Sequence, residues 1–144
     1  MKKTEAAEQL FREGYNCSQA VIAACGPDLG VDRDLCLRLA APFGGGVCRS
    51  GGACGAVTGA LMVIGLRHGG ITVTDPSRKG DIYARGQDFF ARFRARHGAL
   101  VCRDLLGCDI STPAGAQQAR EQNLHEERCA VYVRDAVDIL DQMP

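Results

Sequence analysis

The chain has 144 residues, and its 17 basic and 17 acidic side chains cancel to a formal net charge of zero. Balanced charge produces no long-range field that would gather nucleic acid or an anionic membrane, so we expect neither as a partner. The longest uncharged apolar run, residues 53–66, is shorter than the ~20 residues that a membrane-spanning helix requires. The eight cysteines need an explanation, because a chain of this length can bury a core without disulfide staples.

The apolar pattern predicts an all-α protein. No linker, repeat or low-complexity tract divides residues 1–144, so we expect a single helical domain. Alternating β-branched residues occur only at positions 71–74 (ITVT), a run too short to found a sheet. We predict a single-domain bundle of about six to seven helices around a central apolar helix at about residues 53–67. The first residues are amphipathic and lack a signal-peptide pattern, so we expect a cytoplasmic protein.

Capping signals locate the first helices. Thr4 is expected to cap a first amphipathic helix. Asn16, with Gln19 at the capping-box position, opens a second helix that ends near Gly26. This cap puts Cys17 at the first position of the second helix.

The middle of the chain is predicted to contain the central helix. A third helix begins after Asp32 and ends before Pro42. A glycine-rich segment, residues 44–52, then leads into the uncharged residues 53–66, which stop near His68. Because a helix that is apolar all round is buried on every side, we expect this one at the centre of the domain.

Three more helices are predicted in the second half. An N-cap followed by a proline, at residues 75–76, opens a long helix that reaches about residue 97. A brief helix covers residues 100–106. The last helix begins near residues 125–127, where two carboxylates lie at its positive end. We expect structural roles for the three histidines, because each lies at the end of an expected helix, where a cation or a capping group is favourable: His68, His97 and His125.

Four cysteines fall near the start of an expected helix: Cys17, Cys54, Cys102 and Cys129. The unpaired backbone N–H groups and the positive dipole end at such a position stabilise a thiolate. Three glycines near Cys54 are expected to form a backbone cradle for a sulfur-bound group: Gly51, Gly52 and Gly55. Alternatively, cysteine is a small and often buried hydrophobe that reaches these positions by chance. Position alone leaves both interpretations open.

Four segments carry further information: GYNCSQAV at residues 14–21, FGGGVCRSGGACGAVTGALMVIGL at 43–66, CRDLLGCDI at 102–110 and RCAVYVRDAVDIL at 128–140. In this order they resemble a family named for a C…GCAxxG…C…C cysteine pattern, although the literal GCA string is replaced by ACG around Cys54. The resemblance implies a small, mostly helical, cytoplasmic bacterial or archaeal protein with an attributed redox role. It puts the recurring cysteines at the four positions that the helix starts select.

The other four cysteines have weaker signals. Cys25 and Cys36 lie on apolar helix faces and are expected to pack as core thiols. Cys48 and Cys108 lie at loop-like positions, where a second thiol could resolve an oxidised partner. Cys48 is the candidate resolving thiol for Cys54. The alternative is that Cys48 is an incidental loop thiol, because flexible glycines do not by themselves fix disulfide geometry.

We therefore predict electron or thiol–disulfide transfer, with an unknown redox partner, at a site of four redox thiols: Cys17, Cys54, Cys102 and Cys129. A bound iron–sulfur cluster would deprotonate thiols that burial keeps neutral. One alternative is a non-catalytic module in which the four thiolates hold zinc or another single soft metal ion. Another is a structural bundle, monomer or homodimer, with inert core thiols. The chain lacks C-x-x-C and C-x-x-C-H, which argues against a thioredoxin motif and c-type haem.

Overall fold

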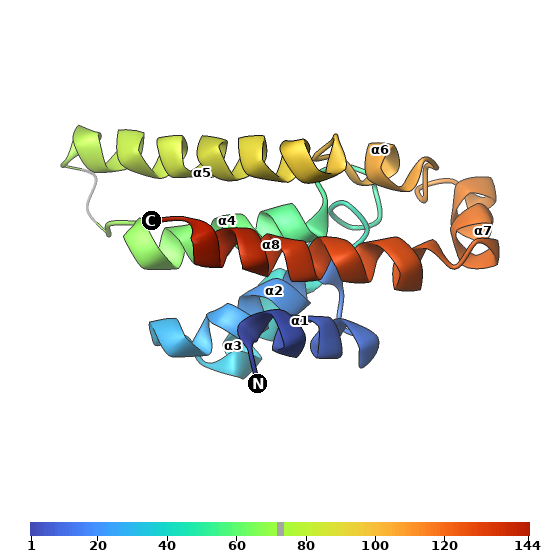
Figure 1. Cartoon of the computed structure of the whole chain (residues 1–144), viewed down its shortest axis with the longest axis horizontal. Coiled ribbons are helices and arrows are strands. Elements are labelled where there is room, and N and C mark those ends of the chain that lie inside the picture. The colour runs from blue at the N-terminus through green and yellow to red at the C-terminus, as the bar shows by residue number, and fades with distance from the viewer. Residues whose placement is uncertain (72–73) are drawn as a thin grey trace.

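The computed structural model describes residues 1–71 and 74–144, and these residues form an all-α protein, as predicted. Of the β-branched run at residues 71–74, residues 72–73 lie outside the described ranges. The described part contains eight α-helices (Figure 1): α1 (Lys3–Arg12), α2 (Cys17–Cys25), α3 (Arg33–Ala40), α4 (Gly55–His68), α5 (Pro76–His97), α6 (Cys102–Leu106), α7 (Pro113–Glu121) and α8 (Ala130–Gln142).

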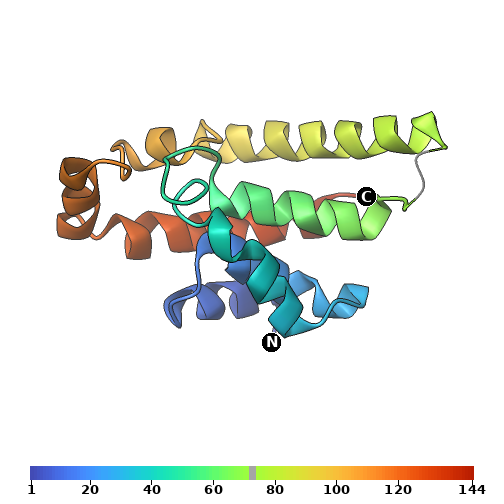
Figure 2. The same cartoon turned by 180° about the vertical axis from the view of Figure 1, so that it is seen from behind.

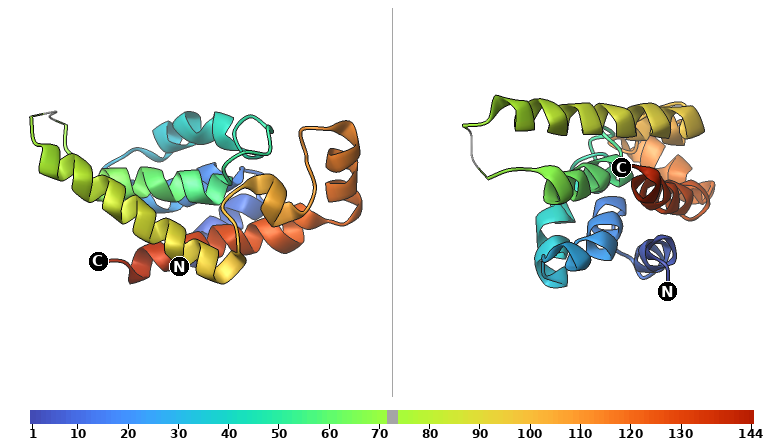
Figure 3. Two further views of the ribbon diagram at one scale, coloured as in Figure 1. Left: turned by 90° about the horizontal axis from the view of Figure 1, so that it is seen from above. Right: turned by 60° about the vertical axis from the view of Figure 1, so that its left-hand side comes forward.

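The helices are arranged in three layers, which Figures 1, 2 and 3 show from different sides. α5 and α6 form one outer layer, α4 and α8 form the middle layer, and α1, α2 and α3 form the other outer layer. α7 lies at one end, beside α6 and the beginning of α8. Because α4 packs against α2, α5 and α8, it is the central helix that the sequence predicts.

Small residues let α4 lie close to α2. A Cβ atom added at Gly59 would lie 2.9 Å from the backbone oxygen of Ser18, so a larger residue would force the helices apart. Ala56, Ala60 and Val63 are fully buried, but Leu66 in the last turn is 40 % exposed. The central helix is therefore enclosed over its first turns and open at its C-terminal end. No helix within the described ranges is long and apolar enough to cross a bilayer.

Most of the predicted caps are present. The Asn16 side chain accepts a hydrogen bond from the backbone N–H of Gln19, and the Gln19 side chain accepts one from the N–H of Asn16. Asp32 accepts from the N–H of Leu35 at 3.2 Å. Asp75 caps α5, and Pro76 is its first residue. These caps use contacts between neighbouring residues, which explains why sequence locates them well.

The structure differs from the sequence expectation at two helices. Thr4 lies inside α1, which begins after Lys2, and the backbone N–H of Lys2 donates to the Glu5 carboxylate at 3.3 Å. α7 was not predicted and brings the count above the expected six to seven helices. It has a standard start, since the Thr112 hydroxyl accepts from the N–H of Gly115 at 3.0 Å. Its sequence, PAGAQQARE, buries only small residues and so has no apolar stripe to recognise.

Candidate functional site

The fold brings the four helix-start cysteines together. Their side chains line one small cavity of about 30 Å³, which we call the thiol cavity. Cys17 begins α2, Cys102 begins α6, Cys54 precedes α4 and Cys129 precedes α8. The cavity lies where the main apolar core meets a smaller apolar cluster built on α6, α7 and the start of α8.

The starts of α2 and α4 approach each other at a glycine. A Cβ atom added at Gly55 would lie 2.9 Å from the Cβ atom of Cys17 and 2.9 Å from the backbone nitrogen of Ser18. Any side chain at this position would therefore push the first turn of α2 away from α4. Gly55, which lines the thiol cavity, thus controls how close Cys17 lies to Cys54.

Two segments far apart in sequence pair just before α4 and α6. The backbone N–H of Cys54 donates to the oxygen of Leu100 at 2.9 Å, and the N–H of Cys102 donates to the oxygen of Gly52 at 2.6 Å. Ala53 and Val101 form the isolated antiparallel bridge between these bonds. This pairing holds the beginnings of α4 and α6 side by side, and Cys54 and Cys102 with them.

The glycine-rich loop before α4 turns in a left-handed sense. Residues 45–49 all have positive φ, between 51° and 69°. Three of them, Val47, Cys48 and Arg49, are not glycine, and such backbone strain costs roughly 1–2 kcal/mol per residue. A Cβ atom added at Gly46 would lie 2.7 Å from the Cβ atom of Cys102, so the loop packs directly on the cysteine.

Only one of the three glycines that were expected to form a cradle lies at the thiol cavity. Gly55 lines the thiol cavity, but Gly51 and Gly52 do not. The N–H groups of Gly51 and Gly52 close the loop on Gly45 and Gly46, and their oxygens accept from α6. Gly45 and Gly46 line the cavity instead, and no local sequence signal separates them from the other loop glycines.

Cys17 and Cys129 form a hydrogen-bonded pair. Donation from the Cys17 thiol is the largest factor that lowers the pKa of Cys129, to about 6, and His125 acts in the same direction. The same hydrogen bond and burial raise the pKa of Cys17 well above its ordinary value. The two shifts have opposite directions because they come from one interaction, so the two thiols titrate as a pair.

The other two thiols of the cavity remain protonated. Burial raises the pKa of Cys54 to about 12, although the backbone N–H groups of Ala56 and Val57 act to lower it. Burial also raises the pKa of Cys102 to about 11, and the nearby Cys129 thiolate adds to that shift. At these two positions, burial outweighs the helix start as an influence on the thiol.

His125 is the functional candidate that the sequence interpretation missed. Its Nδ1 atom lies 3.6 Å from the Sγ atom of Cys129, and the hydrogen bond to Cys129 raises the pKa of the imidazole. The contact forms within one turn of π-helix, His125–Cys129, immediately before α8. The only available signal was the spacing of four positions between His and Cys, which brings side chains together on a helix face.

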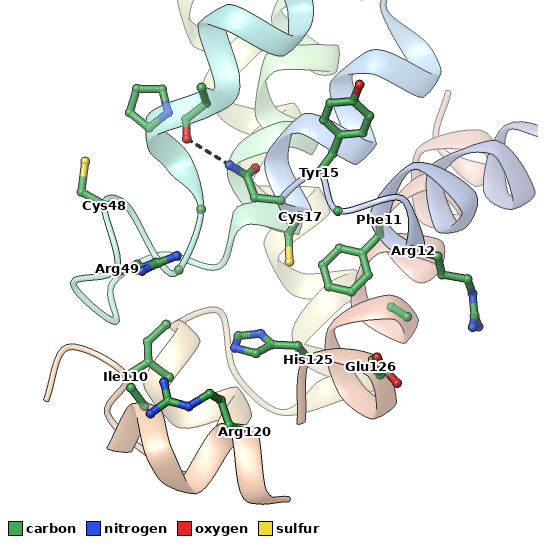
Figure 4. A pocket seen from close by; sticks show the side chains of 18 residues that line it. Phe11, Arg12, Tyr15, Cys17, Cys48, Arg49, Ile110, Arg120, His125 and Glu126 are labelled. Carbon is green, nitrogen blue, oxygen red and sulfur yellow. Dashed lines mark hydrogen bonds between the residues drawn. The ribbon is translucent and has the colours of Figure 1, made fainter. Parts of the chain in front are cut away.

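The remaining cysteines lie outside the thiol cavity. Cys25 and Cys36 are fully buried in the main core, which confirms the prediction that they pack there. Cys108 is half-buried and packs on the smaller apolar cluster. Cys48, the expected resolving thiol for Cys54, is exposed in the left-handed loop, and Figure 4 shows it pointing away from Cys17. All eight thiols are free.

A larger cleft adjoins the thiol cavity. It has a volume of about 1030 Å³ and shares Cys17, Gly45 and His125 with the cavity. Figure 4 shows the Cys17 sulfur pointing into this space from α2, opposite the His125 ring. Cys129 does not line the cleft and is 6 % exposed. Of the hydrogen-bonded pair, Cys17 is therefore the thiol that faces the cleft.

Metal binding requires several donor side chains at one point. Among the residues described, no group of three or more histidine, cysteine, aspartate or glutamate side chains is arranged so that it could hold a metal ion. The cavity cysteines would have to turn toward a common centre to do so.

The chain matches a family model but no individual curated protein or solved structure. A family model described as "Putative redox-active protein (C_GCAxxG_C_C)" matches residues 15–143, which includes all four cysteines of the thiol cavity and the whole glycine-rich loop. The chain belongs to this C_GCAxxG_C_C family.

Proposed function

We propose that this protein transfers electrons by thiol–disulfide exchange, with Cys17 and Cys129 as the working pair. The observation that carries the proposal is that both thiols line one small cavity, while Cys17 also lines the adjoining cleft. The interaction with Cys17 lowers the pKa of Cys129, which supports the assignment. Exchange requires a thiolate near ambient pH and a second thiol within reach. The pair meets both requirements, whereas the protonated Cys54 and Cys102 meet only the second.

The exposure of the two thiols supports an order of reaction in which Cys17 attacks first. Cys17 passes its proton across the hydrogen bond to Cys129 and attacks one sulfur of a disulfide in the cleft. The S–S bond of the substrate breaks, a first thiolate leaves, and it takes a proton from water. Cys17 is then joined to the other half of the substrate in a mixed disulfide.

The second step uses the buried thiol. Cys129 gives its proton to the nearby imidazole of His125 and attacks the Cys17 sulfur. The mixed disulfide breaks, the second substrate thiolate leaves and takes the proton back from the His125 imidazolium, and a Cys17–Cys129 disulfide remains. Two electrons have passed from the protein dithiol to the substrate, which becomes two thiols. The reverse sequence reduces the protein again.

Trapping of the mixed disulfide tests this order. With Cys129→Ser, a small aromatic disulfide should leave one stable adduct on Cys17, because the resolving thiol is missing. With Cys17→Ser, adduct formation in the cavity should be slow, since Cys129 is buried. Cys48→Ser is the matched control: it removes any adduct at the exposed loop thiol and should leave the reaction at Cys17 unchanged. Adducts at Cys48 or Cys54 alone would contradict the proposal.

Native protein purified anaerobically tests the two alternatives. Iron with labile sulfide and visible absorption would indicate an iron–sulfur cluster, and stoichiometric colourless metal would indicate a zinc-type site. Eight unreactive thiols without metal in the native protein would favour a structural bundle. Thiol–disulfide exchange predicts metal-free protein in which Cys17 reacts.

A further inference from the structure

We propose that the cleft beside Cys17 binds a small thiol or disulfide that carries carboxylate groups, and that Arg49 and Arg120 hold those carboxylates. This inference adds a substrate class to the proposed exchange reaction and rests on it for the reaction step. The binding itself is a separate property of the cleft and is tested separately below.

The dimensions of the cleft fit a small organic molecule. Its volume of about 1030 Å³ lies at the upper end of the range of roughly 300–1,000 Å³ that is typical of ligand pockets. Phe11, Tyr15 and Ile110 supply apolar wall, and Cys17 lies at the junction with the thiol cavity. A ligand in the cleft therefore meets apolar surface, polar groups and one reactive sulfur.

The charged groups of the cleft favour an anion. Its lining contains three arginines and one acid, Glu126. Arg12 already pairs with Glu8 at 2.8 Å, and the Asn123 amide donates to the Glu126 carboxylate at 3.2 Å. Within residues 1–71 and 74–144, Arg49 and Arg120 have no carboxylate at ion-pair distance. These two guanidinium groups are therefore free to bind an incoming carboxylate, which their planar fork can engage through two parallel hydrogen bonds.

The two arginines lie on the side of the cleft where the reactive groups point. In Figure 4, Arg49 and Arg120 both lie to the left of the His125 ring, above and below it, and the Cys17 sulfur points toward that ring. Arg12 points away from it. The charge of Arg49 also acts on the His125 ring, whose pKa it lowers. A carboxylate held here would thus bring its attached sulfur close to Cys17.

The strained loop fixes the position of Arg49. A Cβ atom added at Gly45 would lie 2.7 Å from the Cγ atom of Arg49, so the arginine side chain packs on bare glycine backbone. Gly45 lines both the cleft and the thiol cavity. The left-handed turn of residues 45–49 therefore places a cation at the boundary between the two spaces, a placement that a flexible loop would not maintain.

The binding test compares two alkylating reagents that differ in charge. Iodoacetate is anionic and iodoacetamide is neutral, and both modify a cysteine irreversibly at its sulfur. Their rates at Cys17 are measured by peptide mass spectrometry in a Cys48→Ser background, so that the exposed loop thiol does not consume reagent. The ratio of the two rates cancels any change in the ionisation of Cys17, because both reagents need the same thiolate.

Removal of the two charges should affect only the anionic reagent. Arg49→Gln with Arg120→Gln should lower the iodoacetate-to-iodoacetamide ratio at Cys17 by roughly tenfold, and added salt should reduce the difference. Arg12→Gln, which removes an arginine already paired with Glu8, should change the ratio by less than about twofold. An unchanged ratio in the double variant, or an equal fall in the Arg12 variant, would overturn the proposal.

Two matched disulfides test the substrate class. Dithiodipropionate carries two carboxylates, and its diamide is uncharged but of the same size. The double variant should raise the KM for dithiodipropionate by roughly tenfold and leave that for the diamide unchanged. If no Cys17–Cys129 disulfide forms but the alkylation ratio still falls, the exchange reaction is wrong and the anion site stands. If exchange proceeds equally with both disulfides in all variants, the anion site is wrong and exchange stands.

Discussion

The Nδ1 atom of His125 lies 3.6 Å from the Sγ atom of Cys129. One turn of π-helix just before α8 sets this contact, and such wide turns are frequent at functional sites. On the other side, Cys129 accepts the thiol hydrogen bond of Cys17. The sulfur of Cys129 is thus held between a donor that faces the cleft and an imidazole that is exposed to solvent.

The first prediction concerns the ionisation of Cys129. Cys17→Ala should raise the pKa of Cys129 from about 6 by more than His125→Gln does, because the Cys17 thiol is the larger of the two lowering influences. Cys17→Ser retains a hydroxyl donor and should give a smaller shift than Cys17→Ala. Thiolate absorbance in the ultraviolet, recorded against pH, measures the pKa of Cys129 in all three variants. A larger shift in the His125 variant would be inconsistent with the described pair.

The second prediction concerns stability at alkaline pH. In the unfolded chain, Cys54 and Cys102 ionise near their ordinary pKa, but in the folded protein their pKa values are about 12 and about 11. Above pH 9 the unfolded state therefore binds fewer protons than the folded state, and the free energy of unfolding falls as pH rises toward 11. Each thiol contributes up to about 1.4 kcal/mol per pH unit. Denaturant unfolding under reducing conditions measures the slope.

A double variant isolates that contribution. Cys54→Ala with Cys102→Ala should show a shallower decline between pH 9 and pH 11 than the unmodified protein. Cys48→Ala is the control, because Cys48 is exposed and lies outside the thiol cavity. Parallel slopes in the double variant and in the unmodified protein would show that these two thiols ionise as freely in the folded state as in the unfolded chain.

The third prediction concerns the close approach of α2 and α4. Gly55→Ala would put a Cβ atom 2.9 Å from that of Cys17, so we expect a loss of about 1–3 kcal/mol in the free energy of unfolding. Gly65 lies on the same helix with nothing within 4 Å of an added Cβ atom. Gly65→Ala should therefore stabilise the protein by about 0.5–1 kcal/mol.

The same pair of variants has a second readout at the thiol site. Displacement of Cys17 by the Gly55→Ala substitution should raise the pKa of Cys129, since the Cys17 hydrogen bond is weakened, and should slow formation of the Cys17–Cys129 disulfide. Gly65→Ala should change neither quantity. Equal effects of the two substitutions on stability and on the thiol pKa would argue against the close contact at Gly55.

The sequence predicts those parts of the structure that depend on neighbouring residues. The Asn16–Gln19 capping box, the Asp32 cap and the Asp75–Pro76 start of α5 are local, and each is found where expected. The central helix was recognisable because it lacks charge. α7 was not, since a helix that buries only Gly115 and Ala119 leaves no periodic apolar signal.

The site was less predictable because it depends on distant contacts. The helix starts and the family resemblance together selected the four cysteines that line the thiol cavity. Neither gave the pairing of Ala53 with Val101, the π-turn that brings His125 to Cys129, or the burial that keeps Cys54 protonated. These features arise from tertiary packing, so local pattern carries no record of them.

Disulfide mapping across a series of thiol–disulfide buffers tests the central claim most directly. Anaerobically purified native protein is equilibrated in each buffer, quenched with acid, alkylated, and digested for mass spectrometry. The account predicts that a Cys17–Cys129 disulfide is the first to form as the buffer becomes more oxidising, in one reversible two-electron step. Oxidation of another pair while Cys17 and Cys129 stay reduced, or eight reduced thiols in every buffer, would contradict it.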